Sequence, residues 1–197
     1  MASRLFRPTA SIGRSAVASR VAAARQFHAT RPAFVHVGQK VPSIEVLVEN
    51  SPGNKVNLAE EFQKGDGLII GVPGAFSGAC SEKHVPSYIL HPKLKEAGQV
   101  FVVSVNDAFV MKAWGASLDP TEQTGIRFLG DPAGEFTKAL DLDFDATPIF
   151  GNPRSKRYAL VIRDGKVESA HVEPDNTGTN VSLADNVLGA KPYLKDW

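Results

Sequence analysis

The chain has 197 residues, with 22 Lys and Arg against 21 Asp and Glu, and 43% of its residues are hydrophobic. This composition is typical of an ordinary globular domain. The net charge of +1 argues against a nucleic-acid-binding protein, which usually carries a strong basic excess. A single cysteine excludes an intramolecular disulfide bond and a zinc or iron–sulfur site built from thiolates. No apolar run approaches the roughly 20 residues that span a bilayer, so we expect no membrane insertion.

The first 34 residues differ in composition from the rest. They contain no Asp or Glu, and they carry six arginines among many Ala and Ser residues. Such a segment is typical of an organellar transit peptide, and the stretch 25–30 resembles a two-step mitochondrial processing site. We therefore expect residues 1–34 to be a mitochondrial transit peptide, residues 35–197 to form a single domain, and the protein to lie in the matrix. A basic arm that binds nucleic acid is the weaker alternative, because Ala and Ser outnumber the basic residues.

Taken in chain order, the patterns after residue 34 predict alternating strands and helices. The strands are predicted at residues 43–48, 67–72, 99–105, 127–129, 158–162 and 166–172. The helices are predicted at residues 57–62, 107–117 and 133–140, and from Cys80 and Ser182 onward. Residues 51–54 are expected to form a turn, and Asn57, Asn106 and Ser182 to cap helices. The order predicts an α/β fold with a mixed central sheet and helices on both faces.

The loop around Cys80 carries the candidate chemistry. The buried strand 67–72 is followed by a turn rich in Pro and Gly, and a helix is expected to begin near Cys80. Ligands of open α/β sheets bind beyond the carboxyl ends of the strands, and the first turn of a helix offers N–H groups that favour a thiolate. The Ser77 hydroxyl, three residues before Cys80, can reach the sulfur. Cys80 is therefore a candidate nucleophile, and a small buried hydrophobic side chain is the alternative.

Pro73, Ser77 and Cys80 follow the spacing Pro-x-x-x-Ser-x-x-Cys, which resembles the active-site signature of peroxiredoxins. The segments GVPGAF, SVNDAFV, IFGN and VEPD are similar to those of type II, or type 5, peroxiredoxins and occur in the same order. The resemblance covers about residues 37–188. It implies a thioredoxin-like fold and an antioxidant peroxidase that needs no cofactor and acts on hydrogen peroxide and alkyl hydroperoxides.

The resemblance also implies roles for single residues. Cys80 becomes the peroxidatic cysteine, which is oxidised to a sulfenic acid. Ser77 takes the hydroxyl position of the signature, and Pro73 shields the thiolate from water. Arg157 matches the active-site arginine, a permanent cation that can hold the sulfur and the peroxide oxygens. Without the resemblance, three neighbouring basic residues are equal candidates: Arg154, Lys156 and Arg163.

This chain departs from many type II members because it has no second, resolving cysteine. One version of that cysteine would stand at Val181, and another near Val102. The resemblance therefore implies a cycle with one cysteine, in which an external thiol reduces the sulfenic acid. Glutathione with glutaredoxin is the preferred reductant and thioredoxin the other candidate. The family also implies a homodimer, and the lone cysteine is expected to be sensitive to over-oxidation.

Two other classes of function stay open. Cys80 and His84, four residues apart, could be the nucleophile and base of a thiol hydrolase, although no orienting Asp is near them. A thioredoxin-fold binding or redox-signalling protein without catalysis is the second alternative. His91 and His171 show no metal-ligand spacing, and the acidic stretch 141–145 lacks the glycine of a calcium loop.

Overall fold

The computed structural model describes residues 35–190, so the predicted transit peptide lies outside the described residues. A seven-stranded mixed sheet with the order β2-β1-β5-β4-β3-β8-β9 forms its centre. Its strands are β1 (Leu47–Glu49), β2 (Ser51–Val56), β3 (Gly67–Val72), β4 (Gln99–Ser104), β5 (Ile126–Gly130), β8 (Tyr158–Arg163) and β9 (Lys166–Val172). Strands β3, β4 and β5 run parallel to one another, and the outer strands pair antiparallel. Two short strands, β6 (Asp143–Phe144) and β7 (Arg154–Ser155), pair separately.

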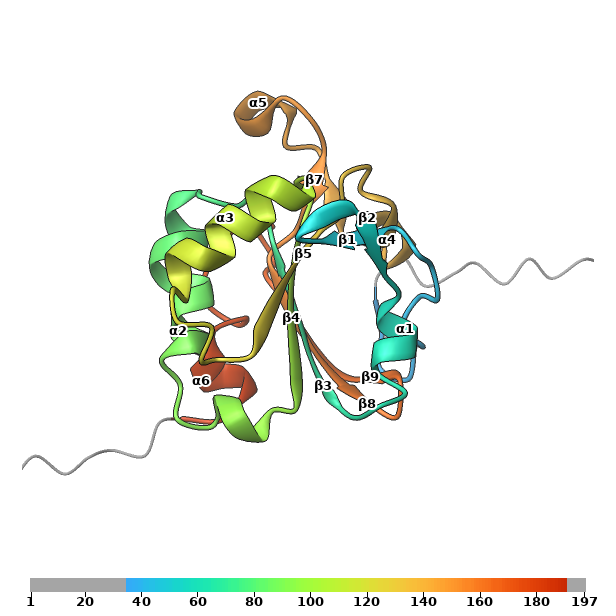
Figure 1. Ribbon diagram of the computed structural model, residues 1–197. Coiled ribbons are helices and arrows are strands. Elements are labelled where there is room, and N and C mark those ends of the chain that lie inside the picture. The colour runs from blue at the N-terminus through green and yellow to red at the C-terminus, as the bar shows by residue number, and fades with distance from the viewer. Residues whose placement is uncertain (1–34, 191–197) are drawn as a thin grey trace, which may run out of the picture. The chain divides into compact units, whose positions relative to one another are not determined.

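Helices cover both faces of the sheet, as the sequence predicts (Figure 1). They are α1 (Leu58–Glu61), α2 (Val85–Ile89), α3 (Ala108–Leu118), α4 (Glu135–Ala139), α5 (Thr147–Phe150) and α6 (Ala184–Val187), with a π-helical turn at Cys80–His84 and a 3-10 turn at Leu94–Glu96. Helices α2, α3 and α6 pack on one face, and α1 and α4 on the other. Each face buries its own hydrophobic core. Within residues 35–190, no helix is long and apolar enough to cross a membrane.

Strands with strong local signals lie where the sequence predicts them. Strand β3 has the predicted bounds, and all six of its residues are buried. Strands β8 and β9 form the predicted hairpin, with Asp164 and Gly165 at φ 50° and 67° in its turn. Positive φ at both turn residues matches the right-handed twist of the strands, so this Asp-Gly pair favours the hairpin.

The predicted turn at residues 51–54 is wrong, because these residues belong to edge strand β2. The chain reverses one residue earlier, at Asn50, whose φ of 60° is a left-handed conformation that Asn tolerates. Pro52 is tolerated in β2 because the strand lies at the sheet edge, where a missing N–H breaks no ladder. The predicted strand 43–48 correspondingly begins only at Leu47.

Two predicted helix caps are also wrong. Asp107, not Asn106, caps α3, since its carboxylate accepts from the amides of Phe109 and Val110. Asp and Asn are comparable caps, so adjacent candidates cannot be separated by type. Ser182 does not cap α6, which begins after Leu183, because its hydroxyl donates to Glu173 instead.

The pairing of β3 with β8 brings distant segments together. Gly71 pairs with Tyr158, and a Cβ at Gly71 would lie 2.0 Å from Cε1 of the Tyr158 ring. Glycine at this position therefore lets the ring lie against β3. The register ends at this pair, so Arg157, the residue before β8, lies near the end of β3, where the Cys80 loop begins.

Candidate active site

Cys80 opens the π-helical turn that follows β3, and its side chain is fully buried. The connecting loop is fixed by bonds to its backbone. The Ala75 amide donates to Oδ1 of Asn106, which also accepts from Ser104. Asn106 is free for this role because Asp107 caps α3. The end of β4 therefore holds the loop that leads to the sulfur.

Two side chains contact the Cys80 sulfur. The Ser77 hydroxyl lies 2.9 Å from Sγ, and Nη1 of Arg157 lies 3.3 Å from it. The Ser77 hydroxyl is also 2.8 Å from the Gly74 carbonyl, and it has one proton to donate to either acceptor. The sulfur thus faces a buried cation and a hydroxyl, an arrangement that can hold an oxygen atom beside it.

The structure separates Arg157 from its basic neighbours. Arg157 is 2% exposed and contacts the sulfur, while its Nε donates to the Thr177 carbonyl. Arg154 donates to the Val105 carbonyl and stacks on the Phe150 ring. Arg163 is exposed and pairs with Glu168 at the far end of β8. Among the hydrogen bonds of the described residues, only Arg157 joins a guanidinium to Cys80.

Pro73 and the residues after it shape the loop above the sulfur. Pro73 is buried. Phe150 of α5 covers the loop, since a Cβ at Gly74 would lie 2.9 Å from its ring. Phe76 adopts a left-handed φ of 58° and exposes 57% of its surface. A bulky residue in this conformation is uncommon, and such strain concentrates at functional sites.

His84 is not placed to activate Cys80. Its Nε2 lies 3.0 Å from the Ser182 carbonyl, and a carbonyl only accepts, so Nε2 carries the proton. Burial, with Arg157 nearby, lowers the pKa of His84 from 6.5 to about 3. A base with so low a pKa has little tendency to take a thiol proton at neutral pH. The structure therefore argues against the thiol hydrolase alternative.

The remaining candidates have structural partners. His91 contacts the Gly189 carbonyl, and His171 pairs with Ser169. Within the described residues, no group of three His, Cys, Asp or Glu side chains could hold a metal ion. Trp114 is buried and donates to the Ser81 hydroxyl beside Cys80, whereas Phe109 of the same helix is 64% exposed.

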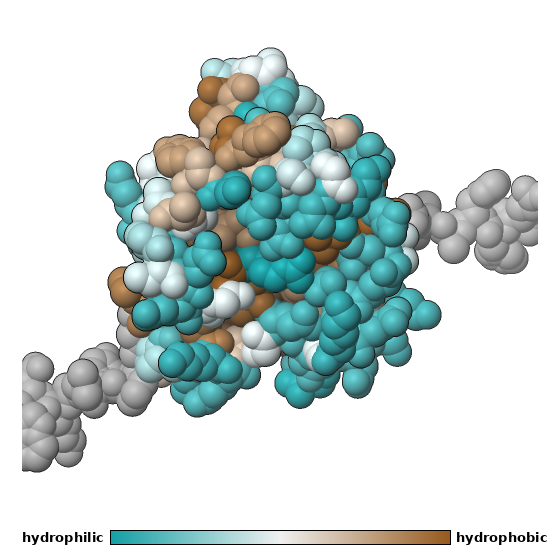
Figure 2. Space-filling model, in the orientation of Figure 1, coloured by the Kyte–Doolittle hydropathy of each residue, from teal (hydrophilic) through white to brown (hydrophobic). Residues whose placement is uncertain are grey.

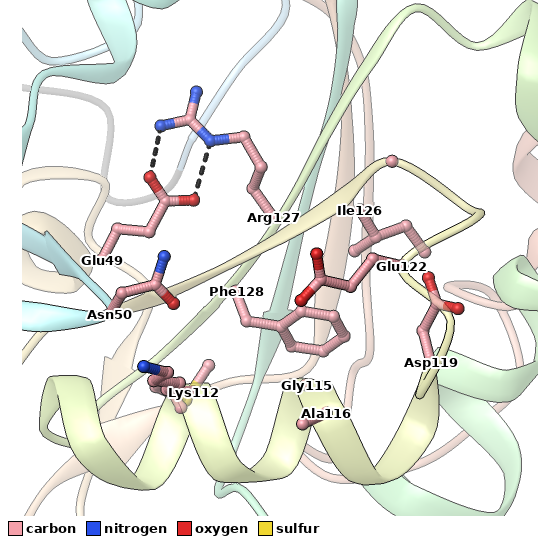
Figure 3. A pocket seen from close by; sticks show the side chains of 12 residues that line it. Glu49, Asn50, Lys112, Gly115, Ala116, Asp119, Glu122, Ile126, Arg127 and Phe128 are labelled. Atoms are coloured by element: carbon pink, nitrogen blue, oxygen red, sulfur yellow. Dashed lines mark hydrogen bonds and ion pairs between the residues drawn. The ribbon is translucent and has the colours of Figure 1, made fainter.

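A cavity of about 300 Å³ lies between α3 and β5, and Cys80 is not among the residues that line it (Figure 3). Arg127 and Glu49 form a two-pronged ion pair at its edge, with N···O distances of 2.8 and 2.7 Å. This cavity therefore offers no cysteine, serine or histidine as a candidate nucleophile.

The chain is similar to known proteins in fold and in sequence. The family described as Redoxin matches residues 36–188. The chain is 44% identical to "Peroxisomal membrane associated protein 20" of Schizosaccharomyces pombe, over 80% of this chain and 99% of that protein. It is 39% identical to "Peroxiredoxin-2F, mitochondrial" of Arabidopsis thaliana, over 67% of this chain and 66% of that protein. It is also similar to the crystal structure of reduced Prx3 in complex with hydrogen peroxide from Vibrio vulnificus. That match has 38% identity and a TM-score of 0.70, over 79% of this chain and 98% of that one.

The fold and the loop define a thiol enzyme of the thioredoxin-like class, with its cysteine beyond the carboxyl end of a central strand. The chain belongs to the redoxin family, and its relatives place it among the peroxiredoxins, the thiol-dependent peroxidases of antioxidant defence.

The buried His84 makes stability depend on pH. Its pKa of about 3 in the fold lies below its ordinary 6.5, so its contribution is present above pH 6.5 and is lost as the pH falls towards 3. We expect acidification from pH 7 to pH 5 to remove about 2 kcal/mol of unfolding free energy through this group. Urea unfolding of the protein and of a His84→Gln variant, at both pH values, measures it. Equal losses in the two proteins would contradict the assignment.

Proposed function

We propose that this peroxiredoxin reduces hydrogen peroxide and alkyl hydroperoxides at Cys80, with Arg157 and Ser77 as catalytic residues and Pro73 as a shield. The convergence of a hydroxyl and a guanidinium on one buried sulfur is the observation that carries the proposal. Hydrogen peroxide is the first substrate to test, since the similar Vibrio vulnificus protein was crystallised with it.

In the proposed reaction, the Cys80 thiolate attacks one peroxide oxygen. The S–O bond forms while the O–O bond breaks, so the sulfur loses two electrons and the peroxide gains them. The leaving oxygen takes a proton and departs as water or an alcohol, and Cys80 is left as a sulfenic acid. The net proton comes from the original thiol, and the Ser77 hydroxyl is placed to pass it on.

Arg157 and Ser77 stabilise the negative charge that moves during this step. Negative charge leaves the sulfur and appears on the departing oxygen as the O–O bond lengthens. The rigid fork of Arg157 can donate to both atoms at once, so it stabilises the transition state more than the separated reactants. Pro73 and Phe150 keep water from competing for these donors.

We expect reduced protein to react with one equivalent of hydrogen peroxide orders of magnitude faster than free cysteine. Stopped-flow Trp fluorescence follows the reaction, because Trp114 bonds to Ser81 beside Cys80. Cys80→Ser abolishes the reaction. Arg157→Ala slows it about 100-fold or more, as loss of a donor to a developing charge does. Ser77→Ala slows it about tenfold, the effect of one neutral hydrogen bond.

Arg163→Ala is the matched control, because Arg163 lies on the same strand and pairs on the surface. Its rate is expected to equal that of the unaltered protein. A rate no better than that of free cysteine would contradict the peroxidase proposal. It would favour instead a redox-signalling or binding role for the fold.

The catalytic cycle is proposed to use Cys80 alone. The 197 residues contain no other cysteine, and the position of one resolving cysteine of the family is occupied by Val181. One glutathione would displace water from the sulfenic acid to form a mixed disulfide. A second glutathione would then release Cys80 and leave oxidised glutathione. A glutaredoxin thiol would instead release Cys80 by taking the glutathione as its own mixed disulfide, which a further glutathione reduces to give oxidised glutathione. Thioredoxin is the second candidate reductant.

The proposed cycle predicts how the oxidised protein is reduced. Mass spectrometry of peroxide-treated protein is expected to show one glutathione on Cys80 after addition of glutathione, and its release by glutaredoxin. Without a reducing thiol, excess peroxide is expected to produce sulfinic Cys80. Turnover with thioredoxin but no glutathione adduct would contradict the preferred reductant, and a stable sulfenic acid in excess peroxide would contradict the predicted over-oxidation.

We also propose a mitochondrial matrix location and a homodimer. The acid-free, Arg-rich residues 1–34 support the location, although similar relatives carry both mitochondrial and peroxisomal names. Figure 2 shows hydrophobic residues over α5 and α3, and the exposed Phe109 of α3 and Ile149 of α5 support an interface at these helices. Import into isolated mitochondria and light scattering test these two points.

A further inference from the structure

Glu173 is a buried carboxylate that the proposed peroxide chemistry does not use. It follows β9 and is 1% exposed. Its Oε1 accepts three hydrogen bonds, from the Asn180 amide at 2.7 Å, the Ser182 amide at 2.9 Å and the Ser182 hydroxyl at 2.7 Å. Its Oε2 has no partner among the described residues. A buried polar group needs hydrogen-bond partners, so the cluster of donors on one oxygen indicates a specific structural task.

These bonds close residues 173–182 into a loop, which we call the 173–182 loop. Arg157 is attached to the same loop at three points. Its amide donates to the Asn176 carbonyl at 2.7 Å, its carbonyl accepts from the Glu173 amide at 3.0 Å, and its Nε donates to the Thr177 carbonyl at 3.1 Å. The guanidinium direction therefore depends on where the loop presents the Thr177 carbonyl.

The other end of the loop holds the helix that carries Cys80. The Ser182 carbonyl accepts from the Tyr88 hydroxyl at 2.6 Å and from Nε2 of His84 at 3.0 Å. His84 lies in the π-helical turn opened by Cys80, and Tyr88 lies in α2, which continues it. A closed ring of bonds thus runs from Cys80 through its helix, Ser182, Glu173 and the loop to Arg157, and back to the sulfur.

We propose that Glu173 is a positioning residue for peroxide reduction: it closes the 173–182 loop and so fixes the Arg157 guanidinium against the Cys80 sulfur. The inference rests on the proposed function, because it assigns Glu173 an effect only through Arg157. The contribution of Glu173 lies in the position of its Oε1 rather than in its charge. Its side chain makes no ion pair within the described residues, and all the hydrogen bonds of that side chain use Oε1.

Two conservative substitutions separate position from charge. Glu173→Asp keeps the charge but withdraws the oxygen by one methylene, whereas Glu173→Gln loses the charge but keeps an accepting oxygen in place. Misplacement of a reacting group by about 1 Å can cost about 100-fold in rate. We therefore expect Glu173→Asp to slow the single-turnover reaction with hydrogen peroxide at least about tenfold, and Glu173→Gln to stay within about threefold.

Glu168→Asp is the matched control, because Glu168 lies on β9 and forms a surface pair with Arg163. It is expected to leave the rate unchanged. Thermal unfolding of each variant verifies that the fold persists at the assay temperature. If Glu173→Asp does not fold, Glu173→Gln carries the test, and a loss of tenfold or more in Glu173→Gln overturns the proposal in either case.

The decisive readout is a double-mutant cycle with Arg157→Ala. If Glu173 acts through Arg157, Glu173→Asp slows the Arg157→Ala protein by less than about twofold. An equal slowing in both backgrounds overturns the proposal, and so does a Glu173→Asp rate equal to that of Glu168→Asp. If Arg157→Ala alone leaves the rate unchanged, the proposed function itself fails, and this result is distinct from the other two.

Discussion

The contact between the Arg157 guanidinium and the Cys80 sulfur is the interaction on which the rest of the site depends. Removing a permanent cation from water is costly, and Arg157 is 2% exposed. The cost is offset only if a negative group and good acceptors face the guanidinium. The Cys80 sulfur and the Thr177 carbonyl lie 3.3 Å and 3.1 Å from it. The sulfur and this carbonyl are thus the acceptors that face the buried guanidinium, so the placement of Arg157 and its contact with the sulfur have one physical origin.

The pairing of the strands in the sheet brings Arg157 next to the Cys80 loop. Parallel β3 and β4 end at the same edge, where their following segments form the Cys80 loop and the Asn106 anchor. Antiparallel β8 begins at that edge, so Arg157 enters the sheet beside the loop. The 173–182 loop then returns from β9 to the helix of Cys80 through Ser182. Segments far apart in the chain thus hold Arg157 within hydrogen-bond distance of the Cys80 sulfur.

Features that depend on a few neighbouring residues were predictable from the sequence. Strand β3 is a continuous apolar run, and the Asp-Gly turn of the β8–β9 hairpin is a local signal. Ser77 reaches Cys80 because it stands only three positions before it in the chain. Arg157 lies 77 residues from Cys80, and only the family resemblance selected it among its basic neighbours. Asn106 and Glu173 were not recognised as site residues, because their partners are set by tertiary contacts. The VEPD segment was a family marker with no physical role attached to it.

We infer that the site stabilises the breaking of the peroxide O–O bond and does not merely provide a reactive thiolate. The most direct measurement compares the rate constants of Cys80 with hydrogen peroxide and with iodoacetamide, each relative to those of free cysteine. Iodoacetamide reports thiolate character, whereas peroxide also uses the donors aimed at the departing oxygen. We predict an enhancement for peroxide that exceeds the enhancement for iodoacetamide by orders of magnitude. Equal enhancements would contradict this inference, because Arg157 and Ser77 would then contribute nothing beyond stabilising the thiolate.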